Sequence, residues 1–410
     1  MGEDARSNSE ARCDKWIQMI GCTKLLCGTA TVSDAIKYKD MPPSEIPHQM
    51  LQFTTGARPL VVWNMTKRCN LRCLHCYIQA EDRDFSGELA TEEGRAFIGD
   101  LGELKVPVLL LSGGEPLLRK DFFELAGYAT DKKIRTVIST NGTLITKDVA
   151  DKMTSAGIQY VGVSLDGGPE THNKFRGVPN AFEKAIDGIR ISMDAGLRGG
   201  VRFTVSQVNY KDLDEVINIV VDEGIPRFCM YHLVYAGRGK EIAKQDITKE
   251  QSRNVMEYLV DKSIELHDAG VDVEILTTDN HADGAYIYNY ILKNAPERAN
   301  EVMELLKMHG GCSAGHKFSN VDNVGDVHAC QFWGHKTLGN VRDKKFSEIW
   351  NDTENEFLQM MREKPKHLKG KCGTCKYNSI CGGCRIRAET VYGDIWAEDP
   401  QCYLSAEEIS

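Results

Sequence analysis

The segment from Leu60 to Leu233 alternates short β-rich runs with amphipathic stretches, and this alternation constrains the fold more than any other feature. Strands that alternate with helices join into a parallel sheet. The β-rich runs are LVVWNM (60–65), VPVLLL (106–111), IRTVIS (134–139), YVGVSL (160–165), VRFTVS (201–206) and RFCMYHL (227–233). Six repeats are two short of a closed eight-stranded barrel. We therefore expect an α/β fold, an open six-stranded (β/α)6 partial TIM barrel with its chemistry at the carboxyl ends of the strands.

The stretches between these runs carry helix signals. Apolar residues recur at helical spacing from Phe182 to Met193, and Gly196 follows where a C-terminal cap is expected. A second helix is predicted from Leu213 to Gly224. Each predicted strand is thus separated from the next by enough chain for a helical crossover.

The rest of the chain divides into segments of different character. We expect a lead-in and linker over 1–55, which includes the extended run MPPSEIP (41–47), and the barrel over 56–240. A mostly helical connection is predicted over 241–308. From 309 to 410 the periodicity fades and glycines and cysteines dominate, as in a small domain held together by metal–ligand bonds.

Charge and hydropathy exclude several classes of protein. The chain has 59 acidic and 50 basic residues, a formal net charge of -9, so the basic surface that nucleic acids require is not expected. No apolar run approaches the roughly 20 residues that span a bilayer. The start of the chain, MGEDARSNSE, lacks the features of a secretory signal. We expect a cytoplasmic protein without nucleic-acid or membrane partners.

Cysteine usage points to metal. The chain has 14 cysteines, and without an export signal their thiols are expected to stay reduced and free for metal binding. Two groups stand out, one near the first strand and one in the last hundred residues. The groups are Cys69, Cys73 and Cys76, and Cys312, Cys330, Cys372, Cys375, Cys381, Cys384 and Cys402. The remaining four, Cys13, Cys22, Cys27 and Cys229, are predicted to be buried apolar residues.

The run TKRCNLRCLHCYIQA places the first group in a C-x3-C-x2-C pattern just after the first strand. Chance would produce this pattern in a chain of this composition with an expectation of roughly 0.02. Zinc is one alternative, with His75 as a fourth ligand. Three thiolates suit a cubane iron–sulfur cluster better, because each binds one iron and the fourth iron stays open to a cofactor or substrate.

This spacing, followed by the aromatic Tyr77, resembles the radical S-adenosylmethionine (SAM) superfamily. The resemblance implies a [4Fe-4S] cluster whose open iron chelates the amino and carboxylate groups of SAM. An electron from the cluster then breaks a carbon–sulfur bond and yields a 5′-deoxyadenosyl radical. The protein holds the cofactor, aims the radical and excludes water.

Other strand ends agree with this resemblance. The turn SGGEP (112–116) is similar to the superfamily's motif for the SAM amino group, with a carboxylate and two glycines that permit close backbone approach. A serine and an arginine twelve residues apart, Ser164 and Arg176, match a pair that contacts the SAM carboxylate. Asp166 is equally well explained as a turn residue. The expected cofactor-binding residues are Tyr77, Gly113, Gly114, Glu115, Ser139, Asn141, Ser164 and Arg176.

The C-terminal cysteines closely resemble the SPASM domain, which holds auxiliary iron–sulfur clusters in radical SAM enzymes. By this analogy one auxiliary [4Fe-4S] cluster is bound by Cys372, Cys375, Cys381 and Cys402. Cys312, Cys330 and Cys384 would give a second cluster only three thiolates. Its fourth ligand would be His316, His328 or a substrate atom, or this cluster would be absent. A zinc ribbon built from C-x2-C pairs is the structural alternative.

Two positions depart from the SPASM pattern. The usual C-x3-C at the end of the central run is here C-x2-C, from Cys381 to Cys384, which leaves the assignment of Cys384 open. Many peptide-oxidising relatives have an aspartate base after the second cysteine, and this chain has Gln331. Because glutamine cannot accept a proton, this position weighs against a peptide maturase of the sulfatase type.

Within the superfamily the chain resembles the haem-biosynthesis branch. The resemblance rests on TKLLCGTAT (23–31), the run from LQFTTGARPL to the cysteine loop, MYHLVYAGRG (230–239) and DNHADG (279–284). It implies that the radical abstracts hydrogen from a tetrapyrrole side chain. The expected reaction removes acetate arms from 12,18-didecarboxysirohaem to give iron coproporphyrin III, with electrons from a ferredoxin or flavodoxin.

An iron tetrapyrrole is a flat apolar disc edged with carboxylates, so its pocket needs aromatic faces, an axial ligand and cations. Tyr231, His232, Tyr235 and Arg238, near the end of the sixth strand, supply these groups, and we expect Tyr231, His232 and Arg238 to act in catalysis. An equally good interpretation is that these four residues are side chains packed at the rim of the barrel without a role in substrate binding. His281 is better explained as a helix cap.

Two alternatives remain. A maturase of a ribosomally made peptide would use the same chemistry, although the forty-residue lead-in is short for a leader-binding domain. An electron carrier or metal-binding scaffold would leave SGGEP and the Ser164–Arg176 pair without a purpose.

Overall fold

The computed structural model describes residues 19–30 and 58–410. The predicted linker MPPSEIP, most of the lead-in and Cys13 lie outside these residues.

All of the predicted strands form, and they lie side by side in chain order as parallel strands. Their bounds are β2 Leu60–Asn64, β3 Val108–Ser112, β4 Arg135–Thr140, β5 Tyr160–Ser164, β6 Arg198–Val205 and β7 Arg227–His232. Nearly every residue of these strands is buried, because helices cover the outer face of a parallel sheet and side chains fill its inner face.

The expectation of exactly six strands is corrected. The sheet has eleven strands within the described residues, in the order β1-β8-β7-β6-β5-β4-β3-β2-β9-β10-β11. The added strands are β1 Ile20–Gly21, β8 Glu274–Thr278, β9 Phe318–Val321, β10 Asp326–His328 and β11 Gly339–Asn340. β8 extends the parallel sheet beyond β7, and β9 pairs in parallel with β2. Both edges of the predicted sheet are therefore covered by strands from later in the chain.

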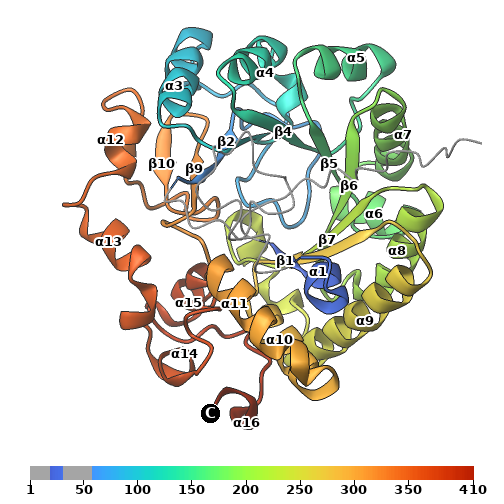
Figure 1. The fold of residues 1–410 in the computed structure, drawn as a ribbon. Helices are drawn as coiled ribbons and strands as arrows, with labels where there is room; N and C mark the ends of the chain where they lie inside the picture. Colours follow the sequence, from blue (N-terminus) through green and yellow to red (C-terminus); the bar gives the residue numbers. More distant parts are fainter. Residues whose placement is uncertain (1–18, 31–57) are drawn as a thin grey trace, which may run out of the picture.

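Helices surround the strands on the outside (Figure 1). Those of the barrel segment and the long helix after it are α3 Thr91–Glu103, α4 Phe122–Asp131, α5 Lys147–Ser155, α6 Pro169–Arg176, α7 Ala181–Asp194, α8 Leu213–Asp222 and α9 Lys249–Asp268. The prediction of α7 and α8 is confirmed. Gly196 and Gly224 follow these helices with φ of 83° and 63°, a left-handed conformation that ends helices and that glycine adopts without strain.

The connection to the C-terminal region is mostly helical, as predicted, apart from β8. It contains α9, α10 Ala282–Asn294 and α11 Ala299–His309. The cysteine-rich region has only short helices, which are α12 Phe346–Trp350, α13 Glu356–Arg362, α14 Gly370–Thr374, α15 Arg385–Tyr392 and α16 Ala406–Ile409. Near the start of the chain, α1 Cys22–Cys27 packs against α9 and β8.

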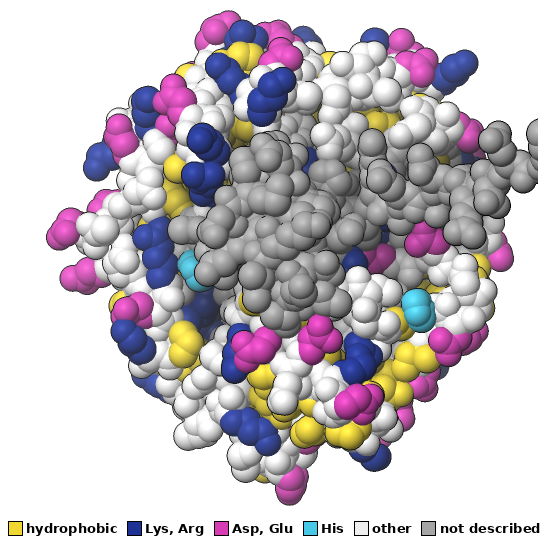
Figure 2. Space-filling model, viewed as in Figure 1, with side chains coloured by type: hydrophobic (Ala, Val, Ile, Leu, Met, Phe, Trp, Pro, Cys, Tyr) yellow, Lys and Arg dark blue, Asp and Glu magenta, His cyan; other side chains and the backbone are white. Residues whose placement is uncertain are grey.

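One hydrophobic core joins the sheet, its outer helices and part of the C-terminal region. Cys22 and Cys229 are buried in it, as predicted for cysteines without a ligand role, and Cys27 is half-buried against it. On the face shown in Figure 2, basic and acidic side chains are interspersed around the rim. None of the helices within 19–30 and 58–410 has the length and apolarity to cross a membrane.

A buried ion pair ties the C-terminal region to the ends of the barrel strands. Arg387, on α15, donates from Nε and Nη2 to the two carboxylate oxygens of Asp399, at 2.9 and 2.8 Å. It also donates to the backbone oxygens of Leu233, at 3.1 Å, and Asp279, at 2.7 Å. Asp399 in turn accepts the backbone N–H of Cys384 at 2.7 Å. The cysteine module is thus fixed directly against the ends of β7 and β8.

Candidate cofactor and substrate site

The loop that follows β2 carries Cys69, Cys73 and Cys76 as free thiols in one small cluster. Each sulfur has a hydrogen-bond donor nearby. The N–H of Leu71 lies 3.4 Å from Cys69 Sγ, the N–H of Ala80 lies 3.3 Å from Cys76 Sγ, and Arg176 Nη1 lies 3.4 Å from Cys73 Sγ. Donors directed at sulfur stabilise thiolates, which are the form that binds iron. The loop therefore fits an iron–sulfur cluster.

The zinc alternatives find no support in the geometry. Within the described ranges, no three histidine, cysteine, aspartate or glutamate side chains converge as the ligands of one metal ion would. The ligands of a cubane lie further apart, because each thiolate binds a different iron. The choice of a cubane over zinc rests on the three thiols of the loop, which give a cubane three ligands and leave its fourth iron open.

The turn after β3 packs directly against the cysteine loop. A Cβ at Gly113 would lie 2.5 Å from the backbone oxygen of Thr66, and one at Gly114 would lie 2.1 Å from that of Arg68. The N–H of Gly114 donates to Thr66 O at 2.7 Å, and the N–H of Glu115 to Arg68 O at 2.8 Å. Only glycine allows this approach, so these residues fix the position of the loop.

The carboxylate of Glu115 is occupied by the protein itself. It is fully buried and accepts the hydroxyl of Thr140 at 2.9 Å and the backbone N–H groups of Asn141, at 2.9 Å, and Leu117, at 3.2 Å. Burial raises its pKa to about 7. Glu115 therefore joins the end of β3 to the end of β4. The sequence had suggested a carboxylate available to a cofactor, but in the structure Glu115 is not among the residues that line the cavity.

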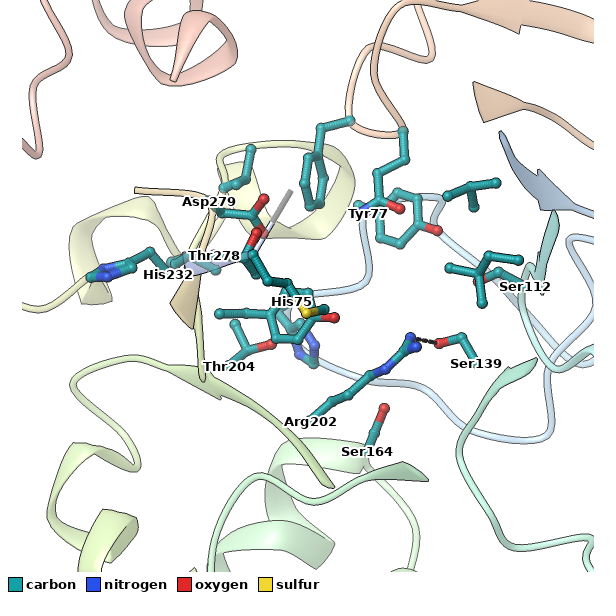
Figure 3. A pocket seen from close by; sticks show the side chains of 18 of the residues that line it. His75, Tyr77, Ser112, Ser139, Ser164, Arg202, Thr204, His232, Thr278 and Asp279 are labelled. Atoms are coloured by element: carbon teal, nitrogen blue, oxygen red, sulfur yellow. Dashed lines mark hydrogen bonds between the residues drawn. The ribbon is translucent and has the colours of Figure 1, made fainter. Parts of the chain in front are cut away.

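A cavity of about 140 Å³ lies at the carboxyl ends of the strands, beside the cysteine loop (Figure 3). Its lining includes the expected residues Tyr77, Ser139, Ser164, Arg176, Tyr231 and His232. Tyr77 donates its hydroxyl to Asn64 Oδ1 at 2.8 Å, and its ring edge meets Phe332 with centroids 5.2 Å apart. Tyr77, Gln331 and Phe332 also line an outer cavity of about 310 Å³.

Arg202 is the cavity residue that sequence reasoning missed. It lies on β6 opposite Ser164 of β5, and its Nη1 donates to the hydroxyl of Ser139 at the end of β4. The three side chains form one polar side of the cavity (Figure 3). The sequence signal was an arginine within the strand run VRFTVS, which is otherwise largely apolar. The structure buries this arginine, and a buried charge is costly unless it has a partner.

Arg176 is held by an ion pair that the sequence did not indicate. Its Nη2 pairs with Asp166, and both side chains are buried. Asp166 also accepts the N–H of Thr204 at 2.7 Å. Asp166 therefore does more than form a turn, because it orients Arg176 between the cavity and Cys73.

Asn141 faces the cysteine loop. Its Nδ2 donates to Asn70 Oδ1 at 2.9 Å and lies 3.9 Å from Cys69 Sγ, and its Oδ1 accepts from Thr143. It is not among the residues that line the cavity. Asn141 thus supports the cysteine loop, whereas Ser139 lines the cavity, where a cofactor would bind.

The residues expected to contact a tetrapyrrole separate in space. Tyr231 and His232 line the cavity, and His232 Nε2 lies 3.0 Å from Asp283 Oδ2. Arg238 instead donates to the backbone oxygens of Cys73, at 2.8 Å, and Ala80, at 3.1 Å, so it secures the cysteine loop. Tyr235 donates to Asp246 at 2.8 Å, away from the cavity lining.

His281 stands at the N-cap position of α10, as expected, but its side chain forms no capping hydrogen bond there. Its ring lies near that of His309, with centroids 5.8 Å apart. The structure therefore places it outside the cavity lining.

The C-terminal cysteines fall into two groups. Cys372, Cys375, Cys381 and Cys402 line one small apolar cavity, the set expected to bind a complete auxiliary cluster. Cys330 and Cys384 are buried in a hydrophobic cluster against which Cys312 packs, and Cys372 of the first group belongs to the same cluster, so the two groups adjoin. Gly382 and Gly383, with φ of 74° and 56°, turn the chain between Cys381 and Cys384 in a conformation that glycine adopts without strain.

The fourth ligand of the second group stays a prediction. His328 Nδ1 lies 3.0 Å from the backbone oxygen of Lys336, and its Nε2 lies 3.5 Å from Asp322. His316 is exposed. Lys364 is buried beside this group, where its ammonium donates to Ala314 O at 2.9 Å.

Comparison with known proteins agrees with this geometry. The radical SAM superfamily matches residues 63–220, and the iron-sulfur cluster-binding SPASM domain matches residues 312–376. Fe-coproporphyrin III synthase of Methanosarcina barkeri is 48% identical over 95% of this chain and 99% of its own. Pre-heme d1 synthase of Dinoroseobacter shibae is 42% identical over 86% of this chain and 87% of its own.

Among solved structures, SuiB of Streptococcus suis bound to its precursor peptide SuiA has a TM-score of 0.69 at 21% identity. The match covers 85% of this chain and 76% of SuiB. At this identity the likeness establishes the fold.

The chain is an enzyme that uses SAM, a [4Fe-4S] cluster and auxiliary iron–sulfur clusters. It belongs to the radical SAM superfamily, in the SPASM-containing branch that includes Fe-coproporphyrin III synthase and pre-heme d1 synthase.

Proposed function

We propose that this enzyme acts in haem biosynthesis and removes the acetate arms of 12,18-didecarboxysirohaem to give iron coproporphyrin III. The observation that carries the proposal is the 48% identity to Fe-coproporphyrin III synthase, which extends over nearly the whole of both chains. A shared activity is the simplest explanation of similarity at that level and coverage. The boundaries 1–55, 56–240, 241–308 and 309–410 remain our proposal for its domains.

When bound, the cluster and SAM supply a 5′-deoxyadenosyl radical that removes a hydrogen atom from the substrate. The residues of the chain bind SAM and the substrate and orient them. Arg202, Ser139 and Ser164 offer polar groups on one side of the cavity, and a guanidinium suits a carboxylate, such as that of the SAM methionine. Phe332 and Val234 supply apolar surface for the tetrapyrrole ring.

The test is incubation of the reconstituted enzyme with SAM, a one-electron reductant and 12,18-didecarboxysirohaem under anaerobic conditions. We expect 5′-deoxyadenosine and iron coproporphyrin III in a fixed ratio. SAM cleavage without a porphyrin product would contradict the substrate assignment while leaving the radical chemistry intact. A matched reaction with Cys73→Ala should yield neither product.

A second candidate follows from the 42% identity to pre-heme d1 synthase. It shares the tetrapyrrole class and differs in the product, a precursor of heme d1. Mass spectrometry of the product distinguishes the two, because each side-chain loss changes the mass by a different amount. The peptide-maturase alternative has weaker support. Mycofactocin maturase MftC of Mycobacterium tuberculosis is 30% identical over 89% of this chain and 88% of its own, and SuiB shares the fold at 21% identity, whereas Gln331 weighs against this alternative.

A further inference from the structure

Asp279 directly follows β8 and lines the cavity, and neither the cofactor contacts nor the cluster ligands involve it. Its Oδ2 is shielded from solvent and has no hydrogen-bond partner among residues 19–30 and 58–410. Such an atom is costly unless a ligand satisfies it. Figure 3 shows Asp279 across the cavity from Ser139 and Arg202, the polar side assigned above to SAM.

The backbone of Asp279 is held in an uncommon conformation. Its φ is 68°, in the left-handed region that aspartate and asparagine tolerate better than most residues. Its carbonyl oxygen accepts Arg387 Nη2 at 2.7 Å, and Asp399 fixes Arg387 through both carboxylate oxygens. Uncommon backbone conformations persist where the surroundings enforce them, often at ligand sites. The carboxyl group is thus presented to the cavity in a fixed position.

The charges around Asp279 oppose one another. Burial disfavours its ionised form, whereas Arg387 from α15, His232 from β7 and a hydrogen bond with Thr278 favour it, and the net effect raises the pKa of Asp279 to about 7. Three further groups that can ionise lie near it, Cys229 and Tyr231 on β7 and Cys330 after β10. Near neutral pH the carboxyl group therefore carries a proton in a large fraction of molecules and can donate it in a hydrogen bond.

We propose that Asp279 is a substrate-binding residue, whose carboxyl group forms a hydrogen bond with one carboxylate side chain of the tetrapyrrole. This inference rests on the proposed function. The side chains of an iron tetrapyrrole end in carboxylates, so a neutral acid at this end of the cavity can bind one without adding charge. Phe332 and Val234 line the same cavity and offer apolar surface to the ring, while the hydrogen bond from Asp279 selects one orientation of the ring in the cavity.

The test is binding of iron coproporphyrin III and of 12,18-didecarboxysirohaem to the anaerobic holoenzyme, followed by the absorbance of the tetrapyrrole between pH 6 and 8.5. Wild-type affinity should fall about tenfold across this range, because the acid loses its proton as the pH rises through about 7. Asp279→Asn keeps a neutral donor and the left-handed backbone, so it should bind equally well at every pH. Asp279→Gly keeps the backbone but removes the group, and should bind about tenfold more weakly at pH 6.

His232 lies beside Asp279 and lowers its pKa, so His232→Gln is measured in parallel. This replacement should move the pH step to higher pH without abolishing it. The inference is wrong if His232→Gln abolishes the step, or if both Asp279 variants bind and titrate as the wild type does; the proposed function then stands. Failure of the wild type to bind either tetrapyrrole at any pH would instead contradict the proposed function, and this inference with it.

Discussion

Replacement of Gly114 by alanine tests whether the turn after β3 positions the cysteine loop. The new Cβ would lie 2.1 Å from the backbone oxygen of Arg68, 2.6 Å from its carbonyl carbon and 3.0 Å from Cys69 Cβ. Contacts below 3.0 Å are not sustained, so the backbone next to Cys69 must move by about 0.9 Å or the turn must withdraw. Overpacking of this kind costs about 1–3 kcal/mol.

The functional loss should exceed the loss of stability. A shift of about 1 Å at a site that orients reactants can lower the rate about 100-fold. We expect Gly114→Ala to bind SAM at least tenfold more weakly and to cleave it about 100-fold more slowly, measured by SAM titration of the reconstituted enzyme and by 5′-deoxyadenosine release. The matched control is Gly127→Ala in α4, where an added Cβ meets nothing within 4 Å. Equal SAM affinity and cleavage rate in the two variants would refute the positioning role.

Three further changes probe other parts of the structure. Asp166→Asn removes the buried partner of Arg176 and should lower the free energy of unfolding by about 3 kcal/mol in anaerobic urea titrations; a loss below about 1 kcal/mol would contradict this. Burial lowers the pKa of Lys317 to about 8, whereas the pKa of a lysine in an unfolded chain is about 10.4. Between these pH values the unfolded state binds more protons than the folded state, so the free energy of unfolding should rise from pH 8 to about 10.4. Lys317→Met should lack that rise. The same dependence of stability on pH in Lys317→Met and in the wild type would contradict the lowered pKa of Lys317. Cys402→Ala should lose about four irons per chain and keep a SAM-responsive EPR signal, whereas loss of that signal would show that the cysteine groups are wrongly assigned.

The strands of the barrel were predictable because their signal is local. Each run from LVVWNM to RFCMYHL is apolar, rich in β-branched or aromatic residues and bounded by turns. β8 and β9 were missed because they lie in segments of other character, β8 among helices and β9 in the cysteine-rich region. Each forms by pairing with an edge strand, β7 or β2, that is distant in sequence. Pairing of this kind depends on the assembled sheet, so local patterns do not reveal it.

The site shows the same division. The spacing of Cys69, Cys73 and Cys76 is a property of one loop and was readable from the sequence. The direction of Glu115 was not, because its carboxylate is satisfied by Thr140 and Asn141 of the following strand end. Arg202 was also missed, since its position opposite Ser164 follows from the register of β5 and β6.

The central claim is that the cluster bound by Cys69, Cys73 and Cys76 has an iron that SAM can coordinate. The most direct test is EPR spectroscopy of the reduced, anaerobically purified Cys402→Ala variant, in which the loss of one auxiliary cluster simplifies the spectrum. The account predicts a [4Fe-4S] spectrum that shifts on addition of SAM and disappears in Cys73→Ala. A spectrum indifferent to SAM, or zinc with four protein ligands at this loop, would contradict it.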